Sequence, residues 1–250
     1  MELVDETGFL GNRILLRQPR KGHRAGTDAA LIIAAARPYL GRRVADLGAG
    51  TGAIGLSLAV LAPGTQVALV EVDAATAALA RQNAALNDCG ERASVFPEDV
   101  RVLARDMRAR QAIGAPFDLV VMNPPFRREQ AARQSPHPAR QLAHIMKEGE
   151  FPLWIGAASA LLRRKGALVL ISEVAQLGTI LAKLTGAFGS VALRPVHPRD
   201  GDCASRLLIL ARKGSRAPLS ISPALVLHQP DGAFTPVADA IHRGEKQLPF

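Results

Sequence analysis

The chain has very little cysteine and few aromatic residues. Its 250 residues include two cysteines, one tryptophan, one tyrosine and eight phenylalanines. Cys89 and Cys203 stand far apart, and neither has cysteine or histidine nearby at metal-ligand spacing. We therefore expect no metal site, and two isolated thiols suit a reducing compartment.

Long apolar runs and a secretion signal are also missing. No apolar run approaches the ~18–20 residues needed to span a bilayer. The N-terminus, Met1 to Glu6, is acidic and does not follow the basic-then-apolar plan of a signal peptide. We therefore expect a soluble, cytoplasmic protein without a membrane partner, and nothing in the sequence indicates an obligate protein partner.

Acidic residues are fewer than basic ones. Lys and Arg number 31 against 22 Asp and Glu, which gives a formal net charge of +9. A basic excess favours an anionic partner, and RNA or DNA more than a membrane, because no basic amphipathic helix stands out. A charge that serves only solubility is the alternative. The hydrophobic content of 48% is sufficient for a core.

Most of the chain alternates between strand and helix patterns. The expected strands are 43–47, 66–71, 93–97, 117–122, 167–172, 190–195 and 206–212. Helices are expected between them at 52–62, 74–87, 100–113, 151–164 and 175–187. Such alternation predicts an α/β fold with a seven-stranded, mainly parallel sheet and helices on both faces. Arg163, Arg164 and Lys165 would face the C-terminal end of a helix dipole.

Two smaller segments flank this region. Residues 1–41 predict a hairpin around Gly11-Asn12, a basic loop, and a helix at 29–39 capped by Thr27 or Asp28. Residues 216–250 predict an extended pair with a turn at Asp231-Gly232 and a final short helix. This C-terminal extension has no second core, so we expect it to pack on the domain at 42–215.

A glycine loop follows the first strand of the alternating region. Val44-Ala45-Asp46-Leu47 leads into Gly48-Ala49-Gly50-Thr51-Gly52. Glycines let a backbone turn tightly and approach a ligand, and the following helix directs its free N–H groups toward the same place. In parallel sheets, ligands bind beyond the carboxyl ends of strands. The loop predicts a nucleotide-like cofactor with contacts from Asp46, Gly48, Ala49, Gly50 and Gly52.

A second polar junction ends the strand at 117–122. There Asn123-Pro124-Pro125-Phe126 places an amide and two prolines at the exit of a buried strand. An ordinary strand-to-turn proline pair is the alternative interpretation.

With both junctions in view, the chain resembles class I methyltransferases that use S-adenosylmethionine (SAM), over roughly 43–212. The tetrad at 123–126 is similar to that of the Asn-Pro-Pro-aromatic amino-methyltransferases. Together with 22–28, the glycine loop, Glu71 and Asp99, it resembles the bacterial tRNA1(Val) adenine-37 N6-methyltransferase family. Departures are Phe126, where that family often has tyrosine, and the arginine-rich loop after it. The resemblance implies a Rossmann-like methyltransferase domain at 42–215, with 1–41 covering the cofactor site.

Further cofactor contacts are expected beyond the glycine loop. Glu71 ends the second strand, where a carboxylate accepts hydrogen bonds from ribose hydroxyls. Val72 would pack on the adenine ring, and Asp99 would accept from the adenine amine or serve as a helix N-cap. Thr27 and Asp28 would cover the methionine end of SAM, or only cap their helix.

The tetrad has a chemical rationale as the catalytic group. The exocyclic amine of adenine is a poor nucleophile because its lone pair is delocalised into the ring. The Asn123 side-chain oxygen and the Pro124 carbonyl can each accept one N–H, which frees the lone pair. Pro124 and Pro125 fix the backbone, and Phe126 can stack on the base, worth roughly 1–3 kcal/mol. Most of the rate would come from positioning.

The residues after the tetrad predict where RNA would bind. Arg127, Arg128, Arg133 and Arg140 follow it directly, and Arg17, Arg20 and Arg24 near the N-terminus could flank the same opening. These side chains could hold phosphates, although a solvated loop is as good an interpretation. A single-stranded RNA loop suits such a site because its bases are already unstacked.

The sequence leaves several functions open. We favour N6 methylation of an adenine in tRNA. Guanine-N2 methylation of ribosomal RNA and glutamine-N5 methylation of proteins keep the chemistry and change the acceptor. A SAM-binding protein without turnover and an NAD-dependent oxidoreductase are alternatives of other classes. The glycine spacing differs from Gly-x-Gly-x-x-Gly, although Glu71 separates SAM from NAD poorly.

Overall fold

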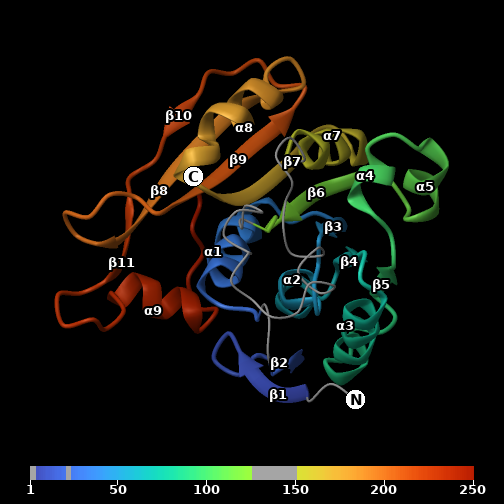
Figure 1. The fold of residues 1–250 in the computed structure, drawn as a ribbon, viewed down its shortest axis with the longest axis horizontal. Coiled ribbons are helices and arrows are strands. Elements are labelled where there is room, and N and C mark those ends of the chain that lie inside the picture. The colour runs from blue at the N-terminus through green and yellow to red at the C-terminus, as the bar shows by residue number, and fades with distance from the viewer. Residues whose placement is uncertain (1–3, 21–23, 126–150) are drawn as a thin grey trace, which may run out of the picture.

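The computed structural model describes residues 4–20, 24–125 and 151–250 of the chain (Figure 1). Its strands are β1 Val4–Phe9, β2 Ile14–Pro19, β3 Arg43–Leu47, β4 Gln66–Val70, β5 Ala93–Phe96, β6 Phe117–Met122, β7 Leu162–Glu173, β8 Phe188–Arg199, β9 Arg206–Lys213, β10 Ser220–Ile221 and β11 Leu225–His228. Its helices are α1 Thr27–Ala36, α2 Ala53–Leu61, α3 Ala74–Leu86, α4 Val100–Leu103, α5 Met107–Ala112, α7 Phe151–Leu161, α8 Leu177–Leu184 and α9 Pro236–His242, with short 3-10 turns η1 Arg37–Tyr39 and η3 Val174–Gln176.

The central sheet has nine strands, so the prediction of seven was wrong in number. The order is β10-β8-β9-β7-β6-β3-β4-β5, with β11 also paired to β8. All pairs are parallel except those that β9 makes with β7 and β8. The two additional strands, β10 and β11, come from the C-terminal extension. The predicted class, a mainly parallel sheet with helices on both faces, is confirmed.

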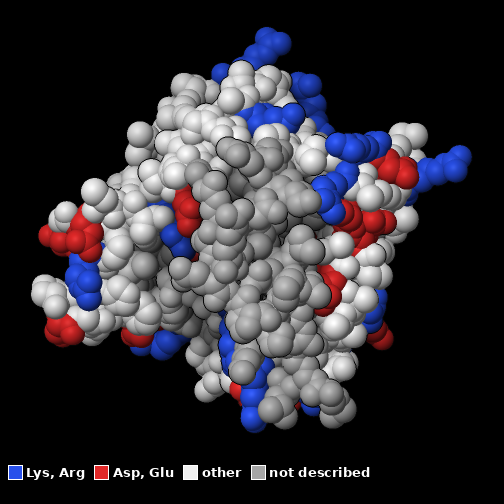
Figure 2. Space-filling model, viewed as in Figure 1, with Lys and Arg blue, Asp and Glu red and all other residues white. Residues whose placement is uncertain are grey.

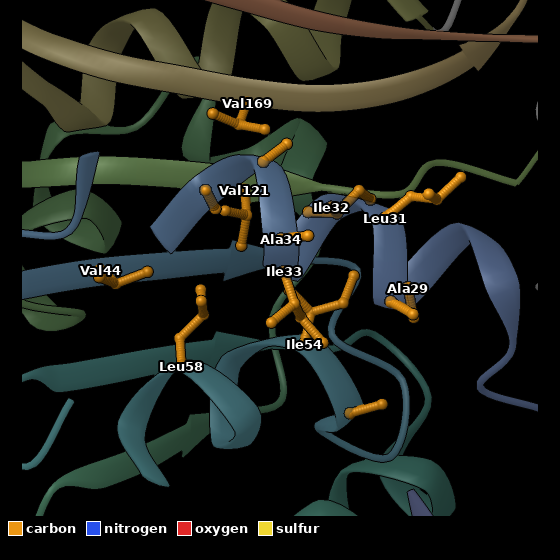
Figure 3. Close-up of a cluster of buried hydrophobic side chains, with 14 of the residues drawn as sticks. Ala29, Leu31, Ile32, Ile33, Ala34, Val44, Ile54, Leu58, Val121 and Val169 are labelled. Atoms are coloured by element: carbon orange, nitrogen blue, oxygen red, sulfur yellow. The ribbon is translucent and has the colours of Figure 1, made fainter. Parts of the chain in front are cut away.

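The sheet separates two apolar cores. One lies between the sheet and α1, α2 and α3, and the other lies between the sheet and α4, α7 and α8. Helix α1 is buried over residues 29–36, as expected for a helix that is apolar all round. Figure 3 shows Ile33 of α1 beside Ile54 and Leu58 of α2, close to Val121 of β6. Among the described residues, no helix is long and apolar enough to cross a membrane.

Several predicted local details differ from the structure. The helix expected at 151–164 ends at Leu161, and residues 162–165 belong to β7 and not to a helix end. Residues 100–113 form two short helices, because Asp106 caps a new helix through the amide groups of Arg108 and Ala109. The predicted helix at 175–187 is the turn η3 followed by α8. Helix α1 begins at Thr27, with Gly26 as its N-cap and no side-chain cap, so Thr27 and Asp28 are not the capping residues.

The N-terminal hairpin is confirmed and is held by two asparagines of α3. β1 and β2 pair antiparallel, and the turn between them contains Gly11 and Asn12. The Asn83 amide accepts from the Arg17 N–H at 2.7 Å and donates to the Arg17 carbonyl at 3.1 Å. One turn later, Asn87 pairs in the same way with Leu15. The two asparagine side chains therefore make the backbone hydrogen bonds with β2 that a neighbouring strand would otherwise make.

The C-terminal extension lies along α1 and β8. Its turn at Asp231-Gly232 and its short helix, α9, are both present as predicted. The Leu248 amide donates to the Ala34 carbonyl at 2.9 Å, and the Phe250 amide donates to the Tyr39 hydroxyl at 3.2 Å. The end of the chain therefore packs along α1, the helix whose first residues are expected to cover the cofactor site.

Candidate functional site

Strand register brings the predicted functional segments side by side. Leu47, the last residue of β3, pairs with Val70 at the end of β4 and with Met122 at the end of β6. The residues that follow, Gly48, Glu71 and Asn123, therefore leave the sheet at one level. The chain order also reverses here, with β4 on one side of β3 and β6 on the other. Such a switch point is where parallel sheets bind ligands.

The three loop glycines have different roles. All three have positive φ, at 68° for Gly48, 58° for Gly50 and 88° for Gly52. A Cβ on Gly48 would lie 2.6 Å from the ring of Trp154, and one on Gly52 would meet Leu56 at 2.8 Å. A Cβ on Gly50 would have no atom of the described residues within 4 Å. Of the three glycines, Gly50 alone has no described neighbour at that position, so the sequence argument that glycine clears room for a ligand applies to Gly50.

Glu71 holds this loop in place. Its Oε2 accepts from the Gly50 N–H at 2.9 Å, and its Oε1 accepts from the Asp73 N–H at 2.9 Å. Each carboxylate oxygen still has a lone pair for another donor. The ribose contact of Glu71 stays a prediction. Beside it, Val72 is 55% exposed, so an apolar side chain is available to a ligand at the end of β4.

Asp46 is a fully buried acid with one unused oxygen. Its Oδ2 accepts from the Gly55 N–H at 2.8 Å, and its Oδ1 has no hydrogen-bond partner among the described residues. Burial raises its pKa to about 7, the Gly55 hydrogen bond opposes this, and the Glu71 charge adds to it. A cationic group beside Asp46 would satisfy Oδ1 and favour the ionised form.

Asp99 caps a helix, as one of its two predicted roles requires. Its side chain accepts from the Arg101 N–H at 2.7 Å at the start of α4 and forms an ion pair with the Arg101 guanidinium. Burial raises its pKa, but the hydrogen bonds and charge of Arg101 outweigh burial and leave the pKa lowered. Its contact with an adenine amine stays a prediction.

Asn123 presents an unsatisfied amide oxygen at the end of β6. The Oδ1 atom is buried and has no hydrogen-bond partner within the described ranges. Pro124 is buried and Pro125 half-buried, so the backbone after Asn123 is fixed by packing as well as by the two rings. Phe126 and the predicted RNA contacts Arg127, Arg128, Arg133 and Arg140 lie outside the described residues.

Thr27 and Asp28 reach the same edge of the sheet but already have partners. Asp28 Oδ2 accepts from Arg206 Nε at 3.1 Å. The backbone of Arg206, at the start of β9, lies opposite that of Glu173, at the carboxyl end of β7. Thr27 Oγ1 lies 3.1 Å from His242 Nε2 of α9. A cofactor contact by either residue stays a prediction.

The arginines of the N-terminal segment are ion-paired. Arg17 contacts Glu6 at 3.1 Å, and Arg20 and Arg24 contact Asp5 at 2.6 and 3.3 Å. Exposed pairs of this kind are weak and exchange readily with other anions. Their predicted contact with RNA is neither supported nor excluded by these pairs.

Sequence reasoning missed several side chains that shape the site. Trp154 of α7 lies against Gly48, and Asn83 donates to the Thr51 carbonyl at 2.9 Å. Arg206 and His242 hold the start of α1. The available signals were weak: Trp154 is the only tryptophan, and Asn83 and Asn87 are spaced by one helical turn.

The residue types at this end of the sheet suit SAM. Among the described residues, none would contact a Cβ on Gly50, Val72 is exposed, and Asp46 has a buried oxygen without a donor, which suits a cation-bearing nucleoside. Within the described residues, no group of three or more His, Cys, Asp or Glu side chains could hold a metal ion. The predicted cofactor residues therefore lie next to a buried amide oxygen, that of Asn123.

Comparisons with known proteins agree with this geometry. The methyltransferase small domain family matches residues 24–194. The tRNA1(Val) (adenine(37)-N6)-methyltransferase of Aeromonas hydrophila is 31% identical over 231 residues, 92% of each chain. The protein of the same name from Yersinia pestis is 27% identical over 92% of this chain and 89% of its own.

Two solved structures extend the comparison. A predicted O-methyltransferase from Agrobacterium tumefaciens, protein Atu636, has a TM-score of 0.73 at 32% identity, covering 89% of this chain and 99% of its own. The 16S rRNA N2 G1207 methyltransferase of T. thermophilus, with AdoMet and guanosine, has a TM-score of 0.59 at 23% identity, covering 84% of this chain and 50% of its own, and it supports the fold alone.

This chain belongs to the methyltransferase small domain family. It is a SAM-dependent methyltransferase, and SAM is its methyl donor. Family membership removes the NAD-dependent oxidoreductase and the SAM-binding protein without turnover from the alternatives.

Proposed function

We propose that this enzyme methylates N6 of an adenine in tRNA. The observation that carries the proposal is the Asn123 oxygen, buried and without a donor beside the cofactor loop. An amide oxygen is a hydrogen-bond acceptor and a poor base. It therefore suits a planar NH2 group, which has N–H bonds to offer, better than a hydroxyl that must be deprotonated.

The residues of the chain divide the work as follows. Bound SAM supplies an electrophilic methyl group on a positively charged sulfur. Asn123 Oδ1 accepts one N–H of the acceptor amine, and the Pro124 carbonyl accepts the other. Both bonds draw the nitrogen lone pair out of the ring system and toward the methyl group. The methyl carbon would exchange its bond to sulfur for the bond to nitrogen, which leaves a neutral thioether, and the amine would lose one proton to solvent, so no strong base is required.

Glu71 and Asp46 serve the cofactor in this scheme. Glu71 fixes the Gly50 backbone and keeps lone pairs for the ribose hydroxyls. Asp46 presents a carboxylate oxygen to the cationic end of SAM, and Val72 presents an apolar surface to the adenine ring. Positioning of this kind can contribute up to about 7–11 kcal/mol to the barrier reduction.

The choice of tRNA rests on the relatives and on charge. Both named relatives carry a tRNA activity in their names, and they align with 92% of this chain. The net charge of +9 suits a polyanion. A single-stranded loop presents an adenine at little unstacking cost.

The test is methyl transfer from labelled SAM to purified tRNA, ribosomal RNA and protein, followed by mass spectrometry of the nucleosides and amino acids. We expect N6-methyladenosine in tRNA. Label in N2-methylguanosine of ribosomal RNA, in N5-methylglutamine, or in a methylated hydroxyl would overturn the assignment of the acceptor. The matching loss of N6-methyladenosine from the tRNA of a deletion strain would establish the reaction in cells.

A further inference from the structure

A group of basic side chains lies at the amino ends of the parallel strands, the end of the sheet opposite the cofactor site. Arg163, Arg164 and Lys165 follow Leu162 at the start of β7. The antiparallel β9 ends next to them with Arg212 and Lys213, and Arg216 follows β9. We call these six residues the amino-edge patch. In Figure 2, Lys and Arg side chains project from the upper margin, where Figure 1 places the start of β7 and the end of β9.

The patch is continuous in space. Arg212 Nη1 donates to the Lys165 carbonyl at 3.5 Å, and Lys213 Nζ donates to the Leu162 carbonyl at 2.6 Å. Arg163, Arg164, Lys165 and Arg216 are exposed, while Arg212 and Lys213 are half-buried. The start of β7 and the end of β9 therefore present their basic side chains on one surface, and Arg216 extends this surface toward β8, where its backbone lies beside Gly189.

Positive charge in the patch is largely uncompensated. Among the described residues, one acid forms an ion pair with the patch: Asp118 pairs with Arg163 at 2.5 Å. Burial lowers the pKa of Lys213, and the nearby charge of Arg110 lowers it further. Neither segment contains an acidic residue. The predicted interaction of residues 163–165 with a helix terminus is not among the described hydrogen bonds.

Some basic side chains elsewhere on the protein are paired with acids. Arg17, Arg20 and Arg24 are paired with acids of β1, and Arg243 is paired with both Asp239 and Glu245. Solubility needs charge but does not need like charges to be clustered, because clustering costs stability through repulsion. A cluster of six basic side chains with one acid among its described ion pairs therefore suits an anionic partner.

We propose that the amino-edge patch binds backbone phosphates of the RNA substrate at a stem away from the methylated base. Clustered guanidinium and ammonium groups suit the phosphates of a nucleic-acid backbone. The inference rests on the proposed function. One RNA molecule can reach both the patch and the active site, because the strands between them, of five or six residues, span only about 17–20 Å. A double-stranded-RNA-binding domain smaller than this protein contacts about 16 base pairs.

The experiment reverses one charge in each segment, Arg164→Glu with Arg216→Glu. Both side chains are exposed, and neither has a side-chain hydrogen bond among the described residues. The matched control, Arg81→Glu with Lys246→Glu, reverses two exposed charges on α3 and near the chain end. Equal thermal unfolding temperatures of the three proteins establish that folding is unaffected. The probes are full-length tRNA and a short hairpin that carries the methylated base.

For the patch variant, we expect at least tenfold weaker binding of full-length tRNA. The slope of log K against log salt should fall by about 1.5–2, as for two lost phosphate contacts. Binding of the short hairpin, kcat at saturating tRNA, and SAM affinity should stay unchanged. The control should bind tRNA as the wild type does.

Three results would overturn the inference: unchanged tRNA affinity and slope in the patch variant, equal weakening for the short hairpin, or equal weakening in the control. Failure of the proposed function looks different. In that case the wild type transfers no methyl group to tRNA adenine, whether or not tRNA binding depends on the patch.

Discussion

At the scale of single residues, Asp46 is the group whose charge most depends on its surroundings. Burial, opposed by the Gly55 hydrogen bond and assisted by Glu71, raises its pKa from 3.8 to about 7. The folded protein therefore holds a proton that the unfolded chain releases above about pH 4. The free energy of unfolding should fall as the pH rises from about 4 to 7, and then level off. Thermal unfolding of Asp46→Asn, compared with the wild type, should lack this decrease.

The same ionisation should govern cofactor binding. A cationic ligand favours the charged form of Asp46, so SAM affinity should rise between pH 6 and 8, by up to tenfold per pH unit below pH 7. Calorimetric titration at several pH values measures this. Asp46→Asn should bind SAM more weakly and with a flatter pH profile. Parallel profiles for the two proteins would mean that Asp46 does not face the cation.

Asn123 should separate catalysis from cofactor binding. Asn123→Ala removes one of two acceptors for the amine, and loss of one preorganised hydrogen-bonding group at a reacting centre typically costs about 10²–10³ in rate. We expect kcat to fall by at least that factor, with SAM affinity within threefold of the wild type. Asn123→Asp, which keeps an oxygen of similar position, should retain more activity. A large loss of SAM affinity in Asn123→Ala would place the side chain against the cofactor instead.

At the scale of elements, α7 sets the position of the glycine loop through Trp154. The ring leaves no room for a Cβ on Gly48, whereas Gly50 has open space at similar φ. Gly50→Ala should therefore cost only the left-handed backbone term, about 1–2 kcal/mol. Gly48→Ala adds a steric clash to the same term and should cost more.

A double-mutant cycle isolates that clash. In a Trp154→Ala background, Gly48→Ala and Gly50→Ala should destabilise the protein to a similar extent, as measured by denaturant unfolding. If Gly48→Ala remains the more costly substitution without the ring, another contact restricts that position. Trp154→Ala alone should weaken SAM binding several-fold, because the loop loses its support on one side.

The element scale also explains which parts of the fold could be predicted. Strands such as Phe117–Met122 are short buried apolar runs, and their boundaries follow from composition. The break between α4 and α5 had a local signal in Asp106, which resembles any other acid until its capping bonds are seen. Strands β10 and β11 are short, and each depends on β8 for pairing. The sequence predicted an extended segment at Leu225–His228, which is β11, but no local pattern indicated that this segment or the two-residue β10 would pair with β8.

At the scale of the whole molecule, the predicted site residues converge because register aligns the ends of β3, β4 and β6. The alternation of strand and helix patterns in the sequence predicted a site at the carboxyl ends of parallel strands, and the motifs identified Asp46, Glu71 and Asn123. The unused oxygens of Asp46 and Asn123, and the contact of Trp154 with Gly48, depend on packing between segments distant in sequence. Hydrophobic pattern carries no information about such contacts, so the structure was needed to find them.

The C-terminal extension provides the molecule-scale prediction, because Arg194 of β8 ties it down twice. Its Nη1 donates to the Pro223 carbonyl at 2.6 Å, and its Nη2 donates to the Pro249 carbonyl at 2.7 Å, with the side chain nearly buried. Arg194→Ala should lower stability by about 2–3 kcal/mol, or roughly 4–12 °C in unfolding temperature. Arg199→Ala, an exposed arginine of the same strand, is the control and should change neither quantity.

Hydrogen exchange distinguishes loss of the extension from general destabilisation. In Arg194→Ala, the Leu248 amide, which donates to Ala34 of α1, should exchange faster, while amides in the centre of β3 should change only as much as global stability does. Because this extension also holds α1 through His242 and Thr27, SAM affinity should fall if Thr27 and Asp28 contact the cofactor. Unchanged SAM affinity together with fast exchange at Leu248 would remove these two residues from the cofactor site and leave them a purely structural role.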